Sequence, residues 1–243
     1  MTTTRYTQDE WLAVFDQAEQ NLPSTLPEYK APNVGTAAFA RTIDHTLLKL
    51  EATEKQVDIL CEEASRHNFK VEATRAVDAG AKELDMVMNH VLLRHRQYSE
   101  VYTDIAAVRT VAPHPIILKV ILETSQLSPR EIIAGCKIAE AAGADYVKTS
   151  TGFNGQGATS ENVQLMKSVV GDNMKIKASG GVKTVNECIV MMEAGAERIG
   201  TSNGVWIMAE AQTMLEQVTH AAGNTDSKGQ RPAASLTRMF SSS

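Results

Sequence analysis

Short apolar segments alternate with helical patterns along most of the chain. The apolar segments have the length and composition of strands and lie at 41–48, 83–88, 116–123, 146–150, 175–179 and 197–201. Several of the helical segments between them begin with a capping-box pattern: Thr53 with Gln56, Ser128 with Glu131, and Thr184 with Glu187. Three helical segments end on the similar phrases DAGAKELD, AAGADYVK and EAGAERIG, whose glycine suits the position after a helix. This repeated helix-to-strand unit predicts a parallel α/β sheet.

The two ends of the chain depart from this alternation. Residues 8–20 have the spacing of an amphipathic helix, and the segment NLPSTLPEYKAPNVG that follows them contains three prolines. The last residues are small and polar, a composition typical of disorder. We therefore expect an N-terminal helix and proline-rich linker over 1–36, one (β/α) domain over 37–220, and a disordered tail over 221–243.

The rhythm breaks at one place inside the domain. Helical patterns at 53–68 and 71–80 follow one another with only Phe69 and Lys70 between them, which is too short for a strand. Two successive helices also occur in ordinary α/β folds, so the break alone has an unremarkable explanation. It leaves six visible strand segments in a chain of 243 residues.

Four successive strand segments each carry a charged residue in an apolar context. These are Asp85 in ELDMVM, Lys119 in IILKVILE, Lys148 in YVKTS and Lys177 in KIKAS. One buried lysine paired with an acid is usually structural, and a solvated strand end would also explain Lys177. Four ionisable groups on neighbouring strands are harder to explain in that way, because each costs desolvation free energy unless the others compensate. The period of two also predicts that Glu123 lies on the same strand face as Lys119.

Two lysines at the carboxyl ends of adjacent strands predict amine chemistry. A lysine is a nucleophile only when it is neutral, and a second cation together with an apolar wall lowers its pKa. A neutral Lys148 would add to a carbonyl carbon and form a Schiff base, while Asp85 would move a proton directly or through water. The chain has no HExxH, Cys/His cluster, GxSxG or Walker A pattern, so the sequence predicts neither a metal nor a cofactor.

A glycine pair directly follows the strand of Lys177. Gly180 and Gly181 precede the helix that Thr184 caps, and backbone N–H groups at such a turn can approach a phosphate closely. The next strand ends in IGTSNG, where Ser202 offers a further donor. In (β/α)8 barrels the loops after the last two strands commonly bind phosphate. These residues therefore predict a phosphate site beside the amine.

Composition narrows the class of partner. The 24 basic and 29 acidic residues are intermixed and give a formal net charge of -5, which argues against nucleic acid and against an anionic membrane as partners. The chain has no apolar run of spanning length and no secretory signal pattern. Cys61, Cys136 and Cys188 are dispersed and odd in number, which favours a reducing compartment over structural disulfides. We expect a cytoplasmic protein.

Six motifs together resemble one enzyme family. IDHTLLK, ELDMVMN, LKVILET, DYVKTSTGF, KASGG and RIGTSNGV are similar to motifs of the deoxyribose-phosphate aldolases, which are class I aldolases with a TIM-barrel fold. The resemblance covers residues 41–210. It implies reversible cleavage of 2-deoxy-D-ribose 5-phosphate to D-glyceraldehyde 3-phosphate and acetaldehyde, in deoxyribonucleotide catabolism. The implied partner is a small phosphorylated sugar, and homo-oligomerisation stays open.

The resemblance also implies roles for individual residues. Lys148 corresponds to the Schiff-base lysine, Lys177 to the second lysine that tunes it, and Asp85 to a member of the proton relay. The phosphate-binding positions correspond to Gly152, Gly180, Gly181 and Ser202. Asp44 in IDHT corresponds to a polar position near the site. We expect Lys119, like Asp44, to support the site.

The chain departs from the family where the rhythm breaks. Family members have there a strand with a cysteine, another helix and a third strand, on the order of 30 or more residues in all. We therefore expect an incomplete TIM-type barrel with about six of its eight strands. Three hypotheses stay open: a deoxyribose-phosphate aldolase with a compromised scaffold, another Schiff-base or phosphate-sugar barrel enzyme, and a catalytically impaired or dead homologue. The last would be a splice variant or truncated product that acts only as a binding or assembly subunit.

Overall fold

The computed structural model describes residues 6–45 and 69–223 of the 243-residue chain. Its strands are β1 (Ile43–His45), β2 (Glu83–Val87), β3 (Ile117–Ile121), β4 (Tyr146–Lys148), β5 (Lys175–Ser179) and β6 (Arg198–Thr201). Its helices are α1 (Gln8–Gln20), α2 (Ala37–Thr42), α4 (Phe69–Asp78), α5 (His90–Arg94), α6 (Tyr98–Val111), α7 (Pro129–Ala141), α8 (Ser160–Val170), α9 (Val185–Glu193) and α10 (Gly204–Gly223), with a 3-10 turn η1 (Thr124–Gln126). Each of the six strands expected from the sequence is present.

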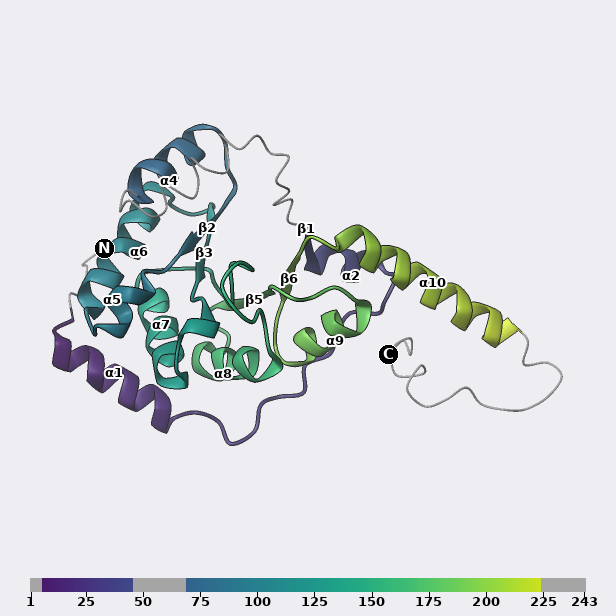
Figure 1. Cartoon of the computed structure of the whole chain (residues 1–243), viewed down its shortest axis with the longest axis horizontal. Helices are drawn as coiled ribbons and strands as arrows, with labels where there is room; N and C mark the ends of the chain where they lie inside the picture. The colour runs from purple at the N-terminus through teal and green to yellow at the C-terminus, as the bar shows by residue number, and fades with distance from the viewer. Residues whose placement is uncertain (1–5, 46–68, 224–243) are drawn as a thin grey trace.

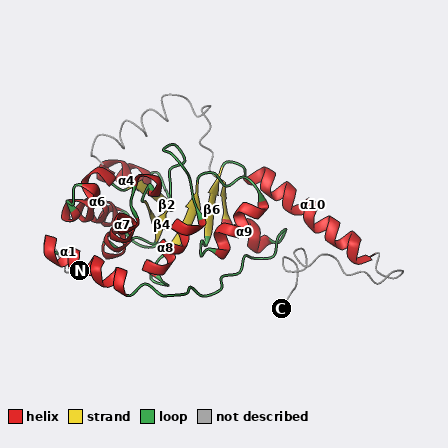
Figure 2. Ribbon diagram, turned by 60° about the horizontal axis from the view of Figure 1, so that its bottom comes forward, coloured by secondary structure: helices red, strands yellow, loops and turns green. Residues whose placement is uncertain are grey.

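The six strands form one parallel sheet with the order β1-β6-β5-β4-β3-β2. Figure 1 shows α7, α8 and α9 along one side of this sheet, with α4 and α6 beside β2 and with α10 extending away next to β1. The second view shows the same helices outside the strands (Figure 2). Among the described residues, no further strand pairs with the outer edge of β1 or of β2. The fold is therefore an incomplete TIM-type barrel, as the sequence predicts.

The two faces of the sheet differ in chemistry. Side chains alternate between faces along a strand, and the outward set packs beneath the helices. This outward set is apolar and fully buried: Leu118, Val120, Val147, Ile176 and Ile199. The inward set contains the four charged residues singled out in the sequence. The central strands β3, β4 and β5 are thus mostly buried on both sides, whereas β2 is partly exposed, and only the outer side is an apolar core.

The inner face is strongly curved. Arg198 on β6 forms an ion pair with Glu83 on β2, although three strands lie between them in the sheet. Lys177 on β5 reaches Asp85 on β2 in the same way. Side chains from the two halves of the sheet can meet only if the sheet curls. The two ion pairs therefore lie inside the partial barrel.

Local sequence signals set most helix ends. Capping boxes start α7 at Ser128 and α9 at Thr184, as predicted, and a third box that sequence reading missed starts α1 at Thr7. The three glycines of the repeated phrase have positive φ angles, as the position after a helix requires: Gly80 at 92°, Gly143 at 80° and Gly195 at 109°. The box expected at Thr53, and the helix expected at 53–68, lie outside the described residues.

Two predicted boundaries differ from the structure. The helix expected at 71–80 runs instead from Phe69 to Asp78, so Phe69 and Lys70 belong to its first described turn. At the other end, α10 extends to Gly223, three residues into the stretch expected to be a tail. The remaining tail residues lie outside the described part, and the proposed division into three regions stays a prediction. No helix in the described ranges is both long and apolar enough to cross a membrane.

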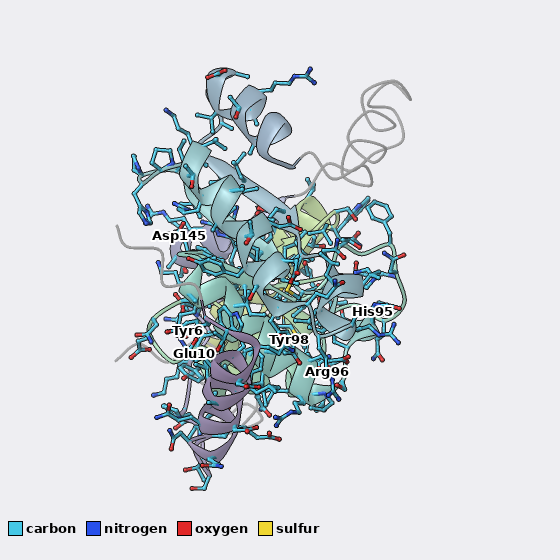
Figure 3. The ribbon with its side chains drawn as sticks, turned by 90° about the vertical axis from the view of Figure 1, so that its left-hand side faces the viewer. Tyr6, Glu10, His95, Arg96, Tyr98 and Asp145 are labelled. Atoms are coloured by element: carbon cyan, nitrogen blue, oxygen red, sulfur yellow. The ribbon has the colours of Figure 1, made fainter. Side chains whose placement is uncertain are left out.

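Helix α1 lies against the outside of α6 and α7 through aromatic side chains. Trp11 stacks on Phe15 with ring centroids 5.7 Å apart, and Phe15 meets the edge of Tyr98 at 4.9 Å. Figure 3 views this side of the molecule and labels Tyr6 and Tyr98 beside α1. Ion pairs from Arg130 on α7 to two acids of α1 complete the contact. The N-terminal helix therefore packs on the domain that follows it.

The open edges of the sheet lead to a first prediction. Insertion of a strand–helix–strand unit of the aldolase family between β1 and α4 should pair these edges and bury more apolar surface. Because ordinary domains are stable by only about 5–15 kcal/mol, we expect the melting temperature to rise by at least about 5 °C and dye binding to exposed apolar surface to fall. An inserted Gly/Ser linker of equal length is the matched control. Equal melting temperatures for the chain and the restored version would contradict this interpretation.

Candidate active site

One carboxylate lies at the centre of the inner face. Asp85 accepts hydrogen bonds from three lysines: from Lys119 Nζ to Oδ1 at 2.8 Å, from Lys148 Nζ to Oδ2 at 2.8 Å, and from Lys177 Nζ to Oδ2 at 3.0 Å. The lysine side chains are 2%, 9% and 3% exposed, in that order. The structure thus brings together the four charged residues that sequence reading placed on neighbouring strands.

The registers of the strands explain this convergence. Asp85 is paired with Lys119 across β2 and β3, and Lys148 is paired with Lys177 across β4 and β5. Paired residues in a parallel sheet point to the same face, so Lys148 and Lys177 lie side by side on the inner face. On the far side of the cluster, Asp44 on β1 accepts a hydrogen bond from Lys177 Nζ at 2.5 Å. Asp44 is therefore in contact with the cluster, and its supporting role stays a prediction.

The pKa values of two of the lysines are shifted in opposite directions, although burial acts to lower both. Burial lowers the pKa of the Lys148 amine most strongly; Asp85 opposes this effect, and the positive charge of Lys177 adds to it, so that the net shift is downward. Burial also acts to lower the pKa of Lys119, but hydrogen bonds to Asp85 and Glu83 outweigh it and raise that pKa. Lys148 is therefore suited to lose its proton, whereas Lys119 is held as a cation.

Asp85 stays ionised in spite of its position. Burial alone would raise the pKa of this carboxyl group, but the positive charges of Lys148 and Lys177 and the hydrogen bond from Lys119 hold it far below its usual range. An ionised carboxylate offers acceptor positions but no proton. Asp85 can therefore orient amines and water, and it can take up a proton only as the neighbouring amines lose theirs.

Lys119 connects the cluster to a second layer of charges. Its Nζ lies 2.5 Å from Glu83 Oε2, and the same carboxylate pairs with Arg198. Arg198 also lies over the ring of Tyr146, with 5.1 Å between the guanidinium carbon and the ring centroid. Glu83 lies two residues before Asp85 on β2 and Tyr146 two residues before Lys148 on β4, whereas Arg198 is the register partner of Lys177. This layer therefore supports the cluster at its side and base.

The expected phosphate positions lie on the loops after β4, β5 and β6. Gly152, Gly180 and Gly181 have φ angles of 96°, 86° and 81°, which other residues rarely adopt. A Cβ on Gly152 or Gly181 would meet no heavy atom within 4 Å, so the backbone there faces open space. Ser202 is exposed, and its hydroxyl donates to Asn203 Oδ1 at 3.4 Å. The carboxyl ends of adjacent parallel strands thus place these residues at one edge of the sheet.

Two glycines at the site were missed by sequence reading. A Cβ on Gly157 would lie 2.1 Å from the Gly180 carbonyl oxygen, so only glycine fits there. A Cβ on Gly200 would lie 2.9 Å from Cε of Lys177, so this glycine leaves room for the lysine stem. Both glycines are required by a close approach between segments that are distant in the sequence, and such contacts cannot be read from one sequence alone.

The position of Glu123 corrects a prediction. Sequence periodicity places it on the face of Lys119, but β3 ends at Ile121 and Glu123 has a left-handed backbone with φ 58°. Its carboxylate accepts hydrogen bonds from Thr151 in the loop after β4. The alternation of faces does not extend past the end of the ladder.

The described cysteines are separate from this chemistry. Cys136 and Cys188 are free and buried, and burial raises the pKa of the Cys188 thiol to about 12. A thiol is a nucleophile only as the thiolate, so these two residues belong to the core. The amine of Lys148 is the better nucleophile candidate.

The chain is similar to proteins of known family. A model described as "DeoC/LacD family aldolase" matches residues 28–209. A protein named deoxyribose-phosphate aldolase from Coccidioides immitis is 42% identical, over 86% of this chain and 94% of the relative. One of the same name from Lysinibacillus sphaericus is 41% identical, over 70% and 94%. The alignment with the C. immitis protein spans 255 positions, although it takes in only 86% of these 243 residues. That relative therefore has positions with no counterpart here.

Solved structures agree with this similarity. The crystal structure of a C. immitis protein assigned as a deoxyribose-phosphate aldolase superposes with a TM-score of 0.75 at 41% identity, over 85% of this chain and 98% of that one. A deoxyribose phosphate aldolase from Aeropyrum pernix, described as tetrameric, superposes with a TM-score of 0.62 over 83% and 97%. At 24% identity, the A. pernix structure supports the fold alone.

The pKa of Lys148 provides a test of the cluster. Lys177→Leu removes a like charge, so the Lys148 pKa should rise, and a larger fraction of the amine should be protonated at any given pH. We expect the midpoint of the Lys148 titration, followed by NMR of isotope-labelled lysine, to move upward by about 1 pH unit. Lys177→Arg keeps the charge and should move it much less. An unchanged midpoint in Lys177→Leu would show that Lys177 does not act on Lys148 electrostatically.

Proposed function

The chain belongs to the DeoC/LacD family of aldolases, and from this membership we propose that it cleaves 2-deoxy-D-ribose 5-phosphate reversibly to D-glyceraldehyde 3-phosphate and acetaldehyde. The proposal places it in deoxyribonucleotide catabolism as an aldehyde-lyase. The observation that carries it is a buried lysine of lowered pKa that shares one carboxylate with a second lysine. Class I aldol chemistry requires such an amine.

Lys148 is the proposed nucleophile. Its neutral Nζ attacks the C1 aldehyde carbon of the open-chain sugar and forms a carbinolamine. Protonation of the carbinolamine hydroxyl group and loss of water then give an iminium ion, in which C1 is bonded to the lysine nitrogen. The electrostatic effect of Lys177 lowers the pKa of this amine and so favours its neutral form before attack. Burial, the larger cause of the lowered pKa, also shields the iminium ion from premature hydrolysis.

Carbon–carbon cleavage follows from the iminium ion as electron sink. A base removes the proton of the C3 hydroxyl, the C2–C3 bond breaks, and its electron pair forms an enamine across C1 and C2. D-glyceraldehyde 3-phosphate leaves with C3 as its new aldehyde carbon. The enamine takes a proton at C2, and water releases acetaldehyde and regenerates Lys148. We assign the proton transfers to Asp85 through a water molecule, because its carboxylate contacts the Lys148 amine.

The phosphate group is assigned to the glycine-rich edge. The loops that carry Gly152, Gly180, Gly181 and Ser202 follow three adjacent strands, and the open backbone at Gly152 and Gly181 allows close approach of an anion. Asp44 and Lys119 keep supporting roles in this proposal, since each contacts the cluster at its side or base. The substrate is thus held by its phosphate while its aldehyde end reaches Lys148.

The other hypotheses are not favoured. The family match argues against a different Schiff-base enzyme, and the assembled lysine pair argues against an impaired or dead homologue. Location in the cytoplasm stays a proposal, supported by the free buried thiols. Homo-oligomerisation is likewise a proposal for this chain, and light scattering after size-exclusion chromatography would test it.

Borohydride reduction tests the nucleophile. In the presence of 2-deoxy-D-ribose 5-phosphate, reduction should trap the acetaldehyde-derived imine and add one ethyl group to the peptide that contains Lys148. Lys148→Met should abolish this adduct, whereas Lys175→Met, at an exposed lysine on the neighbouring strand, should keep it. An adduct at another lysine, with Lys148 unmodified, would reject the assignment.

Asp85→Asn tests the proton transfer separately from imine formation. Loss of the carboxylate should lower kcat by about a hundredfold or more, the usual contribution of general acid–base catalysis. It should also lower the pKa of Lys148 further, because Asp85 normally raises that pKa, so trapping of added acetaldehyde at Lys148 should persist. If kcat were retained, or if trapping were lost together with kcat, Asp85 would not have the proposed role.

A further inference from the structure

Glu123 is a costly residue for the fold. It is 1% exposed, its φ of 58° places a non-glycine residue in the left-handed region, and no ion pair compensates its charge within the described residues. A left-handed backbone is strained for a residue other than glycine, and burying a carboxylate without a cation is also unfavourable. Such costs persist where a site needs the geometry.

The backbone at Glu123 forms a bulge next to the proposed nucleophile. The Leu122 N–H donates to the Lys148 carbonyl and the Thr124 N–H donates to the Thr149 carbonyl, both at 2.9 Å. The carbonyl groups of two successive residues, Lys148 and Thr149, therefore accept from N–H groups that lie two residues apart in the other segment. Glu123 is the extra residue between them, and a bulge of this kind turns its side chain out of the regular alternation.

The Glu123 side chain turns toward the loop after β4. Oε1 accepts from the Thr151 N–H at 3.3 Å, and Oε2 accepts from the Thr151 hydroxyl at 2.5 Å and from Asn154 Nδ2 at 3.4 Å. The Thr151 hydroxyl in turn accepts from the Phe153 N–H at 3.2 Å. Both carboxylate oxygens thus act as acceptors, and they also fix the direction of the Thr151 hydroxyl.

The loop is fixed at its other points as well. Ser125 donates to the Asn154 carbonyl at 2.6 Å. Further along, the Ala158 N–H donates to the Gly180 carbonyl at 3.0 Å, and Gly157 packs directly on Gly180. Segment 151–157 therefore spans from the end of β3 to the end of β5, across the strand that carries Lys148.

These contacts leave one backbone donor open. The N–H groups of Thr151 and Phe153 are both used within the loop. Gly152 lies between them with open space at its Cβ position, and its N–H makes no hydrogen bond within the described residues. We propose that Glu123 is a positioning residue that presents the Gly152 N–H to the phosphate of the substrate; this inference rests on the proposed function. Glu123 acts through Thr151 and does not itself touch the substrate.

The chemistry requires a carboxylate at this position. An amide at residue 123 offers one acceptor and one donor group, so it would set an N–H against one of the two Thr151 donors. We therefore expect Glu123→Gln to raise KM for 2-deoxy-D-ribose 5-phosphate by about tenfold, with kcat nearly unchanged. For unphosphorylated 2-deoxy-D-ribose, kcat/KM should stay within about twofold. The preference for the phosphorylated sugar should thus fall by about tenfold.

Three further variants sharpen this test. Thr151→Val should reproduce the effect of Glu123→Gln, and the double variant should be no worse than either alone, because both break one linkage. Thr151→Ser keeps the hydroxyl group, so this variant should keep the preference for the phosphorylated sugar. Glu131→Gln, which removes a carboxylate from the cap of α7, should leave the preference unchanged. If Glu123→Gln fails to fold, Thr151→Val carries the comparison.

Equal losses for both sugars, or an unchanged preference, would overturn the inference. Binding of inorganic phosphate, measured by calorimetry, separates it from the proposed function because it requires no catalysis. If the natural chain binds phosphate but forms no imine, the aldolase proposal fails, and weaker binding by Glu123→Gln still supports the role of Glu123. If the natural chain binds no phosphate, or if Glu123→Gln binds it equally well, the role of Glu123 is wrong.

Discussion

The site depends on one carboxylate shared among three amines inside a curled sheet. Asp85 offsets the repulsion among three buried lysines on adjacent strands and holds their amines close together on the inner face. Within the described residues, the inner face holds four basic side chains and three carboxylates: Lys119, Lys148, Lys177 and Arg198 against Asp44, Glu83 and Asp85. These charges balance when one basic group is neutral. The pKa values of Lys119 and Arg198 are raised and that of Lys148 is lowered. The charge balance and the pKa shifts therefore both favour Lys148 as the neutral group, which is also the proposed nucleophile.

Sequence reading could find this cluster because strand periodicity is local. A charged residue in the middle of an apolar segment can be recognised in the sequence. The parallel order of the strands then brings Asp85, Lys148 and Lys177 to one face. Helix caps and the glycines after helices are also local, and the predictions at Ser128 and Thr184 are confirmed. The family resemblance and the incomplete barrel are confirmed as well.

What sequence reading missed depends on contacts between distant segments. The pairing of Glu83 with Arg198 follows from the curl of the sheet, and the contact of Gly157 with Gly180 follows from two loops that cross. Strand alternation did not apply to Glu123, because β3 ends at Ile121 and a bulge interrupts the period there. The roles assigned to the individual site residues stay predictions, since geometry shows proximity and not turnover.

The strand order has a consequence for synthesis on the ribosome. β1 is made early, yet its partner in the sheet is β6, which is made more than 150 residues later by the numbering of Ile43 and Ile199. Helix α1 likewise packs on α6 and α7, which emerge after it. The N-terminal segment therefore leaves the exit tunnel long before its docking surfaces exist, and it must wait unpaired while the central strands assemble.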